Sequence, residues 1–344
     1  MKKVVVTGSQ GFIGGYLVDE LLKAGYFVVG IDNYSKYGKV SKPHDSNKNF
    51  QLVEEDLALS NKKLLESLKG ASHLIANAAK IGGITYFHSY AYDLLATNER
   101  IMANTCDAAI EIHKSANNSL QKVTYMSSSM VYEGATTWPS SEGDQLRINP
   151  PESAYGFQKL AVEYFANAAY DQYGLPFTIL RPFNCVGIGE ARAINSKSVN
   201  SGNIQLAMSH VLPDLVQKVL KGQDPLHILG DGNQIRHYTY GGDLARGIVM
   251  SLENKNALNN DFNLSTKKPM TVVELAEIVW NKIYSNNKKF SFVCDAPFPH
   301  DVRKRIPNTA KARDLLGFSA ETSIEVVLDE VIPWIKNAIS LDLI

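Results

Sequence analysis

The sequence predicts an α/β fold in which a doubly wound parallel sheet is followed by a smaller C-terminal α/β domain. Through the first half of the 344 residues, short β-branched runs alternate with helix-length segments, as in a parallel sheet wrapped by helices. Continuous apolar runs such as Val4 to Val6 suit strands that are buried on both faces. After about Phe183 this alternation gives way to polar loops and shorter elements. We therefore expect one domain over 1–182 and a second, mainly substrate-binding domain over 183–344.

The predicted elements follow in chain order. The strands of the first half are KVVVTG (3–8), YFVVGID (26–32), NFQLVEED (49–56), SHLIANAA (72–79), KVTYMSS (122–128) and PFTILRPFN (176–184). In the second half, apolar periodicity predicts helices over 205–220, 271–283 and 323–338, and short strands in LHILG and IRHYTY. A short segment near 235–262 is expected to return to the first domain.

Composition limits the classes of partner. Lys+Arg and Asp+Glu number 35 each, so no global field draws the chain to nucleic acid or to an anionic membrane. Cys106, Cys185 and Cys294 lack metal-ligand spacing, which predicts no metal site and fits thiols in a reducing compartment. The apolar run after MKK is too short for a signal peptide, and no later stretch has the length of a membrane span. We therefore expect a cytoplasmic protein.

A glycine-rich turn follows the first predicted strand. In TGSQGFIGG, Gly8, Gly11 and Gly14 permit a tight turn whose backbone N–H groups approach a pyrophosphate at a helix N-terminus. Asp32 ends the second strand, where a carboxylate accepts hydrogen bonds from an adenosine ribose and repels a 2′-phosphate. The pattern predicts a Rossmann-type domain that binds NAD rather than NADP. The predicted cofactor residues of this part are Gly8, Gly11, Phe12, Ile13, Gly14, Asp32 and Asn33.

The spacing TGxxGxxG resembles that of extended short-chain dehydrogenases/reductases, in particular the NAD-dependent nucleotide-sugar epimerase/dehydratase family that includes UDP-glucose 4-epimerases. This resemblance implies further cofactor contacts after the third and fourth strands and on the next helix. They are Asp56 and Leu57 at the adenine, Asn77, Ala78, Ala79 and Lys80 along the cofactor, and Asn98 near the nicotinamide ribose. Position 98 is equally compatible with an ordinary polar helix residue.

AYGFQK places Tyr155 and Lys159 one turn apart on a predicted helix, so both side chains share a face. Such spacing is common by chance, but here it accompanies a predicted cofactor cradle. Free tyrosine has a pKa near 10, and a nearby ammonium and an oxidised nicotinamide both favour the phenolate. A phenol tuned in this way takes a proton from a sugar hydroxyl as hydride leaves for the cofactor. We therefore predict that Tyr155 and Lys159 form a catalytic pair that also contacts the cofactor.

Three consecutive serines, Ser127 to Ser129, end the fifth predicted strand, where the ligand crevice of such sheets lies. A hydroxyl there can stabilise charge on the reacting oxygen. In the family that this chain resembles, the catalytic Ser or Thr lies four residues before the tyrosine of a VY pair, which implies Ser128. Ser129 is the alternative and an expected substrate contact. Capping of backbone groups also explains serines at a strand end.

The residues after Ser128 separate reaction classes. Family members that resemble dehydratases or decarboxylases carry acidic residues there, whereas this chain has Ser129 and Met130, and a thioether cannot exchange protons. The cysteine that fucose-synthase-like enzymes place at position 130 is also absent. The remaining Ser/Tyr/Lys set implies a 4-epimerase that oxidises carbon 4 of a UDP- or GDP-hexose to a transient ketone and returns hydride to the opposite face. Two alternatives stay open: a net 4-dehydrogenase or 4-ketoreductase, for which a GDP-sugar is one candidate substrate, and a non-catalytic NAD-binding regulator.

The second half carries the expected substrate contacts. GDGNQIRHYTYGGDLARGI resembles the family segment whose arginine pairs with the diphosphate, which implies Arg236, and a guanidinium can bind phosphate with two parallel hydrogen bonds. Asn184 in RPFN matches a substrate-contacting asparagine. In DVRKRIPNTAKARDLLGF, Arg303 is the predicted second arginine, and Arg305 fits nearly as well. The nucleotide base stays open, with UDP favoured as the commoner substrate of this catalytic set.

Family members pair through two long helices, which correspond here to 93–113 and 153–173. The resemblance therefore implies a homodimer. An apolar helix face in these segments is equally compatible with internal core.

Overall fold

The central sheet of this computed structural model has seven parallel strands in the order β13-β6-β5-β4-β1-β2-β3. The structure describes all residues except 82–89, 190–198, 202, 207–209 and 298–301. The strands are β1 (Lys3–Thr7), β2 (Phe27–Asp32), β3 (Phe50–Glu54), β4 (His73–Ala76), β5 (Lys122–Met126), β6 (Phe177–Pro182) and β13 (Asn260–Leu264). Each of the first six lies inside a predicted strand, which confirms the predicted parallel α/β sheet. The seventh comes from far later in the chain and pairs with β6.

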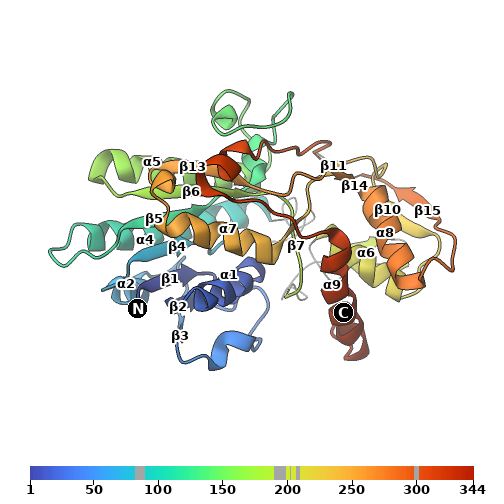
Figure 1. The fold of residues 1–344 in the computed structure, drawn as a ribbon, viewed down its shortest axis with the longest axis horizontal. Helices are drawn as coiled ribbons and strands as arrows, with labels where there is room; N and C mark the ends of the chain where they lie inside the picture. Colours follow the sequence, from blue (N-terminus) through green and yellow to red (C-terminus); the bar gives the residue numbers. More distant parts are fainter. Residues whose placement is uncertain (82–89, 190–198, 202, 207–209, 298–301) are drawn as a thin grey trace.

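Helices cover both faces of this sheet (Figure 1). They are α1 (Phe12–Lys23), α2 (Lys62–Leu68), α4 (Ala91–His113), α5 (Ala154–Tyr173) and α7 (Gly241–Glu253). Val5 packs into the core shared with α2, α4 and α5, whereas Val4 and Val6 pack into the core shared with α1 and α7. Successive strand residues point to opposite faces, so a continuous apolar run serves both layers.

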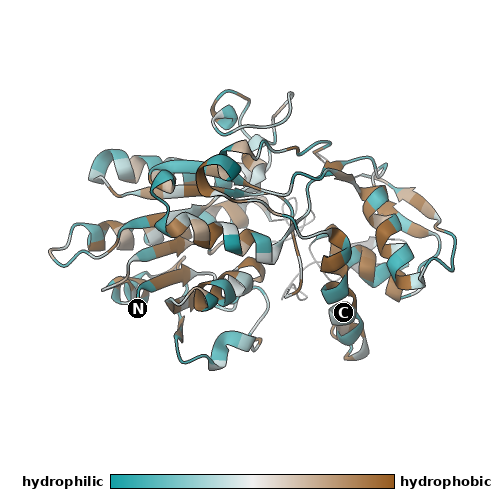
Figure 2. Cartoon of the chain, viewed as in Figure 1, coloured by the Kyte–Doolittle hydropathy of each residue, from teal (hydrophilic) through white to brown (hydrophobic). Residues whose placement is uncertain are grey.

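A smaller unit lies beside the sheet, at the right of Figure 1. It contains α6 (Val211–Leu220), α8 (Val272–Tyr284), α9 (Ile324–Ser340) and the parallel pair β10 (Leu226–Leu229) and β15 (Phe292–Asp295). These helices and strands enclose a separate core around Trp280, which is fully buried. In Figure 2 the helices of both units carry apolar and polar colours together, as expected for elements with one buried face.

Short elements complete the connections. They are β7 (Cys185–Val186), β8 (Val199–Ser201), β9 (Ile204–Leu206), β11 (Ile235–Arg236), β12 (Thr239–Tyr240), β14 (Met270–Thr271), and the short helices η1 (Pro43–Ser46), η2 (Ser129–Tyr132), η3 (Asp144–Leu146), η4 (Lys255–Ala257) and η5 (Ala312–Leu316). None of the helices in the described part of the chain has the length and apolar character needed to cross a membrane.

The helix predicted to begin at residue 205 was wrong in its first part. Residues 204–206 form β9, which pairs antiparallel with β8, and α6 begins only at Val211. The pairing partner lies several residues upstream, so helical periodicity alone could not reveal it. The later helices begin and end within two residues of their predicted bounds. Thr271 accounts for one of these starts, because its hydroxyl accepts a hydrogen bond from Glu274 N at 3.1 Å in a capping box.

Candidate active site

A cavity of about 690 Å³ lies at the carboxyl ends of the parallel strands and is lined by both units. This is where ligands bind in open α/β sheets. The predicted residues that line it are Gly8, Gly11, Phe12, Ile13, Gly14, Asp32, Asn33, Asp56, Leu57, Asn77, Ala78, Ala79, Lys80, Ser128, Ser129, Tyr155, Lys159, Asn184 and Arg236. Asn98 and Arg303 do not line it. The structure therefore brings most of the predicted site together around one space.

The glycine turn has no room for a side chain at Gly8 or at Gly14. A Cβ at Gly8, whose φ is +70°, would lie 2.9 Å from Ala78 Cα, and a Cβ at Gly14 would lie 2.0 Å from the Gly8 carbonyl oxygen. The turn therefore packs directly against the residues that follow β4. It leads into the N-terminus of α1, where backbone N–H groups lack partners within the helix. This cradle fits a pyrophosphate held by backbone groups.

Asp32 closes the same end of the cavity. Its carboxylate accepts hydrogen bonds from Gln10 N at 2.9 Å and from Tyr34 N at 2.8 Å, so it is fixed beside the glycine turn. Burial raises the pKa of this carboxyl, and the backbone hydrogen bonds oppose that effect. A carboxylate in this place accepts hydrogen bonds from ribose hydroxyls and disfavours a 2′-phosphate. The residues present thus fit NAD.

The side chains of Thr7 and Asn98 fix the segment after β4 through hydrogen bonds to its backbone. Thr7 Oγ1 accepts hydrogen bonds from Asn77 N at 3.0 Å and from Ala78 N at 2.9 Å. Asn98 accepts from Lys80 N at 2.6 Å and donates to Lys80 O at 2.9 Å, and only 1% of its surface is exposed. Asn98 therefore holds the backbone that lines the cavity and does not reach the cavity itself. The position of Asn98 near the nicotinamide ribose stays a prediction, and the observed contacts of its side chain are with the backbone of Lys80.

Tyr155 and Lys159 both line the cavity. Both are buried on the first turns of α5, and Lys159 Nζ lies 6.0 Å from the centre of the Tyr155 ring. Lys159 Nζ donates to Met126 O at 2.8 Å, which anchors the lysine to the end of β5. Burial lowers the pKa of Lys159 to about 8. Lys159 therefore keeps most of its charge at neutral pH.

Ser128 and Arg305 tune the tyrosine. Burial raises the pKa of the Tyr155 phenol, whereas the hydrogen bond with Ser128 and the positive charge of Arg305 lower it. Ser128 lies two residues after the end of β5 and is the N-cap of η2, where its hydroxyl accepts a hydrogen bond from Met130 N at 3.2 Å. A phenol under these influences can exchange a proton with a bound hydroxyl.

The two predicted arginines occupy different places. Arg236 is buried and lines the cavity, where its Nη1 donates to Ile235 O at 3.0 Å. Arg303 forms an ion pair with Asp231 at 2.9 Å, and 68% of its side chain is exposed. Arg305 lines the cavity and donates to Asn184 Oδ1 at 3.4 Å. Of the two arginines considered near the C-terminus, Arg305 therefore lines the cavity together with Arg236, whereas Arg303 lies at the surface.

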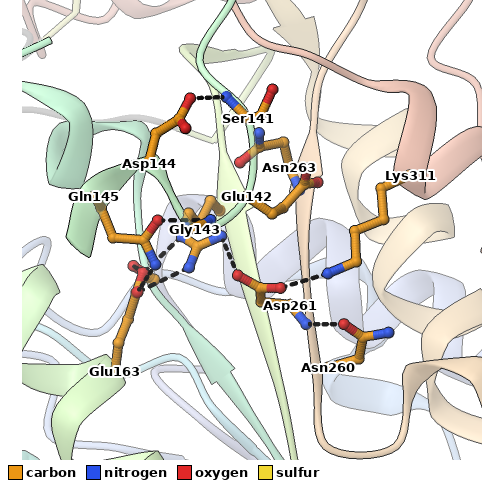
Figure 3. A network of polar contacts seen from close by, with 12 residues as sticks. Ser141, Glu142, Gly143, Asp144, Gln145, Glu163, Asn260, Asp261, Asn263 and Lys311 are labelled. Carbon is orange, nitrogen blue, oxygen red and sulfur yellow. Dashed lines mark hydrogen bonds and ion pairs between the residues drawn. The ribbon is translucent and has the colours of Figure 1, made fainter. Parts of the chain in front are cut away.

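A network of charged and polar side chains includes Glu163, Asp261 and Lys311 (Figure 3). Glu163, one turn after Lys159 on α5, accepts two hydrogen bonds from Arg181 at 2.7 and 2.8 Å and one from Ser127 Oγ at 2.6 Å. The third arm of Arg181 pairs with Asp261 at 2.7 Å, and Asp261 pairs with Lys311 at 2.6 Å. The network therefore joins α5 to β5, β6 and β13, the elements that carry or adjoin the catalytic groups.

Glu133 also lines the cavity, and the sequence analysis did not select it. It ends η2 one short-helix turn after Met130, and its Oε2 accepts from Ser153 N at 3.0 Å and Ser153 Oγ at 2.9 Å. Glu133 could have been selected from the sequence only if a short helix had been predicted after the serines, because such a helix places Glu133 on the same side as Met130. Among the described residues, no group of three or more His, Cys, Asp or Glu side chains is arranged to hold a metal ion.

Comparison with known proteins agrees with this geometry. The model of the NAD dependent epimerase/dehydratase family matches residues 4–265. The UDP-N-acetyl-alpha-D-glucosaminuronate decarboxylase of Bacillus cytotoxicus is 27% identical over 98% of this chain and 98% of its own length. The UDP-glucuronic acid 4-epimerase of Bacillus cereus, solved with UDP-glucuronic acid and NAD, has a TM-score of 0.78 at 26% identity, covering 97% and 99% of the two chains. The UDP-N-acetylglucosamine 4-epimerase of Methanobrevibacter ruminantium, solved with UDP-N-acetylmuramic acid, has a TM-score of 0.79 at 26% identity, covering 98% of each chain.

The matched family is NAD-dependent, and the glycine cradle and Asp32 supply the fit for that cofactor. The buried Ser/Tyr/Lys set gives the chain the groups of an enzyme of the extended short-chain dehydrogenase/reductase type. The family match spans more than half of the sequence and includes the glycine turn and the Tyr155 helix. The chain belongs to the NAD dependent epimerase/dehydratase family, whose members act on nucleotide sugars.

Proposed function

We propose that this enzyme is a nucleotide-sugar 4-epimerase, acting at carbon 4 of a UDP- or GDP-hexose with NAD that stays bound. The observation that carries the proposal is one cavity with three parts: a cofactor cradle at one end, buried Tyr155 beside Ser128 at the centre, and Arg236 with Arg305 at the other end. We assign 1–182 to the NAD-binding domain, together with β13 and the helix before it, and the remaining residues from 183 to the substrate-binding domain.

Each residue has a distinct task in this mechanism. Bound NAD supplies the acceptor and donor of hydride. Tyr155 takes the proton of the carbon-4 hydroxyl and later returns it, while Ser128 hydrogen-bonds the reacting oxygen. The charge of Lys159 favours the phenolate form of Tyr155. Arg236 and Arg305 hold the diphosphate by charge-assisted hydrogen bonds.

Met130 supports epimerisation over dehydration. It lines the cavity close to Ser128, and its thioether has no proton to exchange. The same Ser/Tyr/Lys set would also serve a net 4-dehydrogenase or 4-ketoreductase, which releases a ketosugar. The two structural relatives described above are named as 4-epimerases of UDP-sugars, which favours epimerisation and UDP.

The test is turnover of a panel of UDP-, GDP-, CDP- and dTDP-hexoses by the purified enzyme without added cofactor. We expect interconversion of two 4-epimers, seen by chromatography and mass spectrometry, with no net change in NADH absorbance. Stoichiometric NADH together with a ketosugar would establish the oxidoreductase instead. Absence of turnover with every member of the panel would reject both.

We also propose a homodimer that forms through α4 and α5. Aromatic side chains remain exposed on the outer surface of these helices, including Tyr92 on α4 and Phe157 and Tyr164 on α5. Phe157 and Tyr164 are seven residues apart, so they share a helix face that a second copy would cover. Light scattering is expected to give the mass of two chains, and Tyr164→Arg is expected to shift it toward one. A single-chain mass for the unmodified protein would exclude this dimer.

A further inference from the structure

Two features beside Tyr155 oppose a negatively charged sugar. We propose that this enzyme accepts nucleotide sugars with an uncharged hexose and rejects uronic acids, and that Met130 and Glu133 determine this specificity. The proposal deepens the proposed function and rests on it, because it requires Tyr155 to mark the position of the reacting sugar carbon. The proposed substrate therefore differs from the glucuronic and glucosaminuronic acid sugars for which two of the relatives are named.

The first feature is an apolar surface around the reactive phenol. Met130 is 5% exposed and packs with Tyr155 and Leu94, and Ile81 and Val302 pack against this cluster. Met130, Ile81 and Tyr155 all line the cavity. The described apolar side chains of this surface, Met130, Leu94, Ile81 and Val302, carry no hydrogen-bond donor, so a sugar carboxylate placed against them would lose water without compensation. A hydroxymethyl or methyl group at the same place loses far less.

The second feature is a carboxylate on the same side of the short helix η2. Residues three apart in a 3₁₀-helix lie one above the other, so Glu133 stands over Met130, and Glu133 N donates to Met130 O at 3.1 Å. Ser153 holds the Glu133 carboxylate through both its backbone N–H and its hydroxyl. Ser153 is the N-cap of α5, two residues before Tyr155. The negative charge is therefore fixed next to the helix turn that carries the phenol.

Three of the cations that line the cavity are engaged elsewhere once substrate is bound, so these three do not compensate Glu133. Arg236 and Arg305 then face the two negative charges of the diphosphate. Lys159 donates to Met126 O behind the tyrosine. A second carboxylate on the sugar would meet Glu133 as a like charge in a partly enclosed site, where repulsion is weakly screened. An ionised carboxylate only accepts hydrogen bonds, so Glu133 instead favours hydroxyl or amino groups of the sugar.

The test compares UDP-glucose with UDP-glucuronate, which share one nucleotide, so that any preference for another base cancels. We expect the unmodified enzyme to show kcat/KM at least a hundredfold higher for UDP-glucose. Glu133→Gln keeps the shape and removes the charge, and we expect it to reduce this ratio at least tenfold, mainly through a lower KM for UDP-glucuronate. A purely structural role for Glu133 would lower kcat for both sugars and leave the ratio unchanged.

Glu152→Gln is the matched control, because Glu152 is exposed, immediately precedes Ser153 and does not line the cavity. It should leave the ratio unchanged within a factor of two. Equal or better use of UDP-glucuronate by the unmodified enzyme would overturn the proposal, and so would an unchanged ratio in Glu133→Gln.

Binding separates failure of this proposal from failure of the proposed function. Calorimetry on the Tyr155→Phe protein, still loaded with NAD, measures affinity for the two UDP-sugars without turnover. A preference of at least tenfold for UDP-glucose there supports the specificity even if the reaction proves to be different. Equal affinity would reject the specificity while leaving epimerisation of sugars intact.

Discussion

Tyr155→Phe is expected to lower kcat by about a thousandfold, because it removes the proton carrier of the proposed reaction and little else. The ring is buried against Met130 and Leu94, and phenylalanine preserves these contacts. Fold and NAD content should therefore stay as in the unmodified protein. The measurements are kcat with the best sugar of the panel, the thermal unfolding midpoint, and NAD released on denaturation.

Tyr164→Phe on the same helix is the matched control, because 63% of Tyr164 is exposed and it lies outside the cavity. It should retain kcat. Undiminished turnover in Tyr155→Phe would reject the assigned mechanism. A large fall in the unfolding midpoint would instead show that the hydroxyl is needed for the fold.

Arg181→Met is expected to destabilise the protein by about 3–5 kcal/mol, because removing one partner leaves a buried charge uncompensated. Arg181 has no exposed surface, and it pairs with Glu163 and Asp261 while its guanidinium lies 5.6 Å from the centre of the Tyr132 ring. Loss of the guanidinium would leave Glu163 facing only Ser127 and Gln145. The free energy of unfolding is measured by denaturant titration.

Two comparisons make this prediction specific. The double variant Arg181→Met with Glu163→Gln removes both charges and should recover part of the lost stability. Arg313→Met breaks an exposed pair with Asp314, which solvent screens, and should leave the free energy of unfolding nearly unchanged. Equal effects of Arg181→Met and Arg313→Met would mean that burial does not amplify the ion pair.

Local sequence patterns were sufficient for six of the seven strands of the central sheet and for the glycine turn. The strands of the first half are short apolar runs, and burial on both faces leaves that signature directly in the chain. Gly8 and Gly14 report a steric requirement at their own positions. Tyr155 and Lys159 share a helix face by their spacing, and the structure places both in the cavity.

Contacts between distant segments decided what the sequence could not predict. Arg303 and Arg305 look alike in the chain, but Arg303 pairs with Asp231 at the surface, whereas Arg305 contacts Asn184 and lines the cavity. Asn98 was predicted near the nicotinamide ribose, and no local pattern indicated that its amide also satisfies both backbone groups of Lys80. The periodicity of the sequence predicts neither the surroundings of the two arginines nor the hydrogen-bond partner of Asn98.

The pairing of β13 with β6 determines when the central sheet can be completed during synthesis. A ribosome must deliver residues 260–264 before the last strand of the sheet can join, although its neighbour was completed at Pro182. Until then Arg181 lacks Asp261, and the β6 border offers unpaired backbone groups to any strand nearby. Residues 1–182 alone therefore lack the last strand of the central sheet. The last strand of the sheet, β13, becomes available only after residues 183–259 have been synthesised.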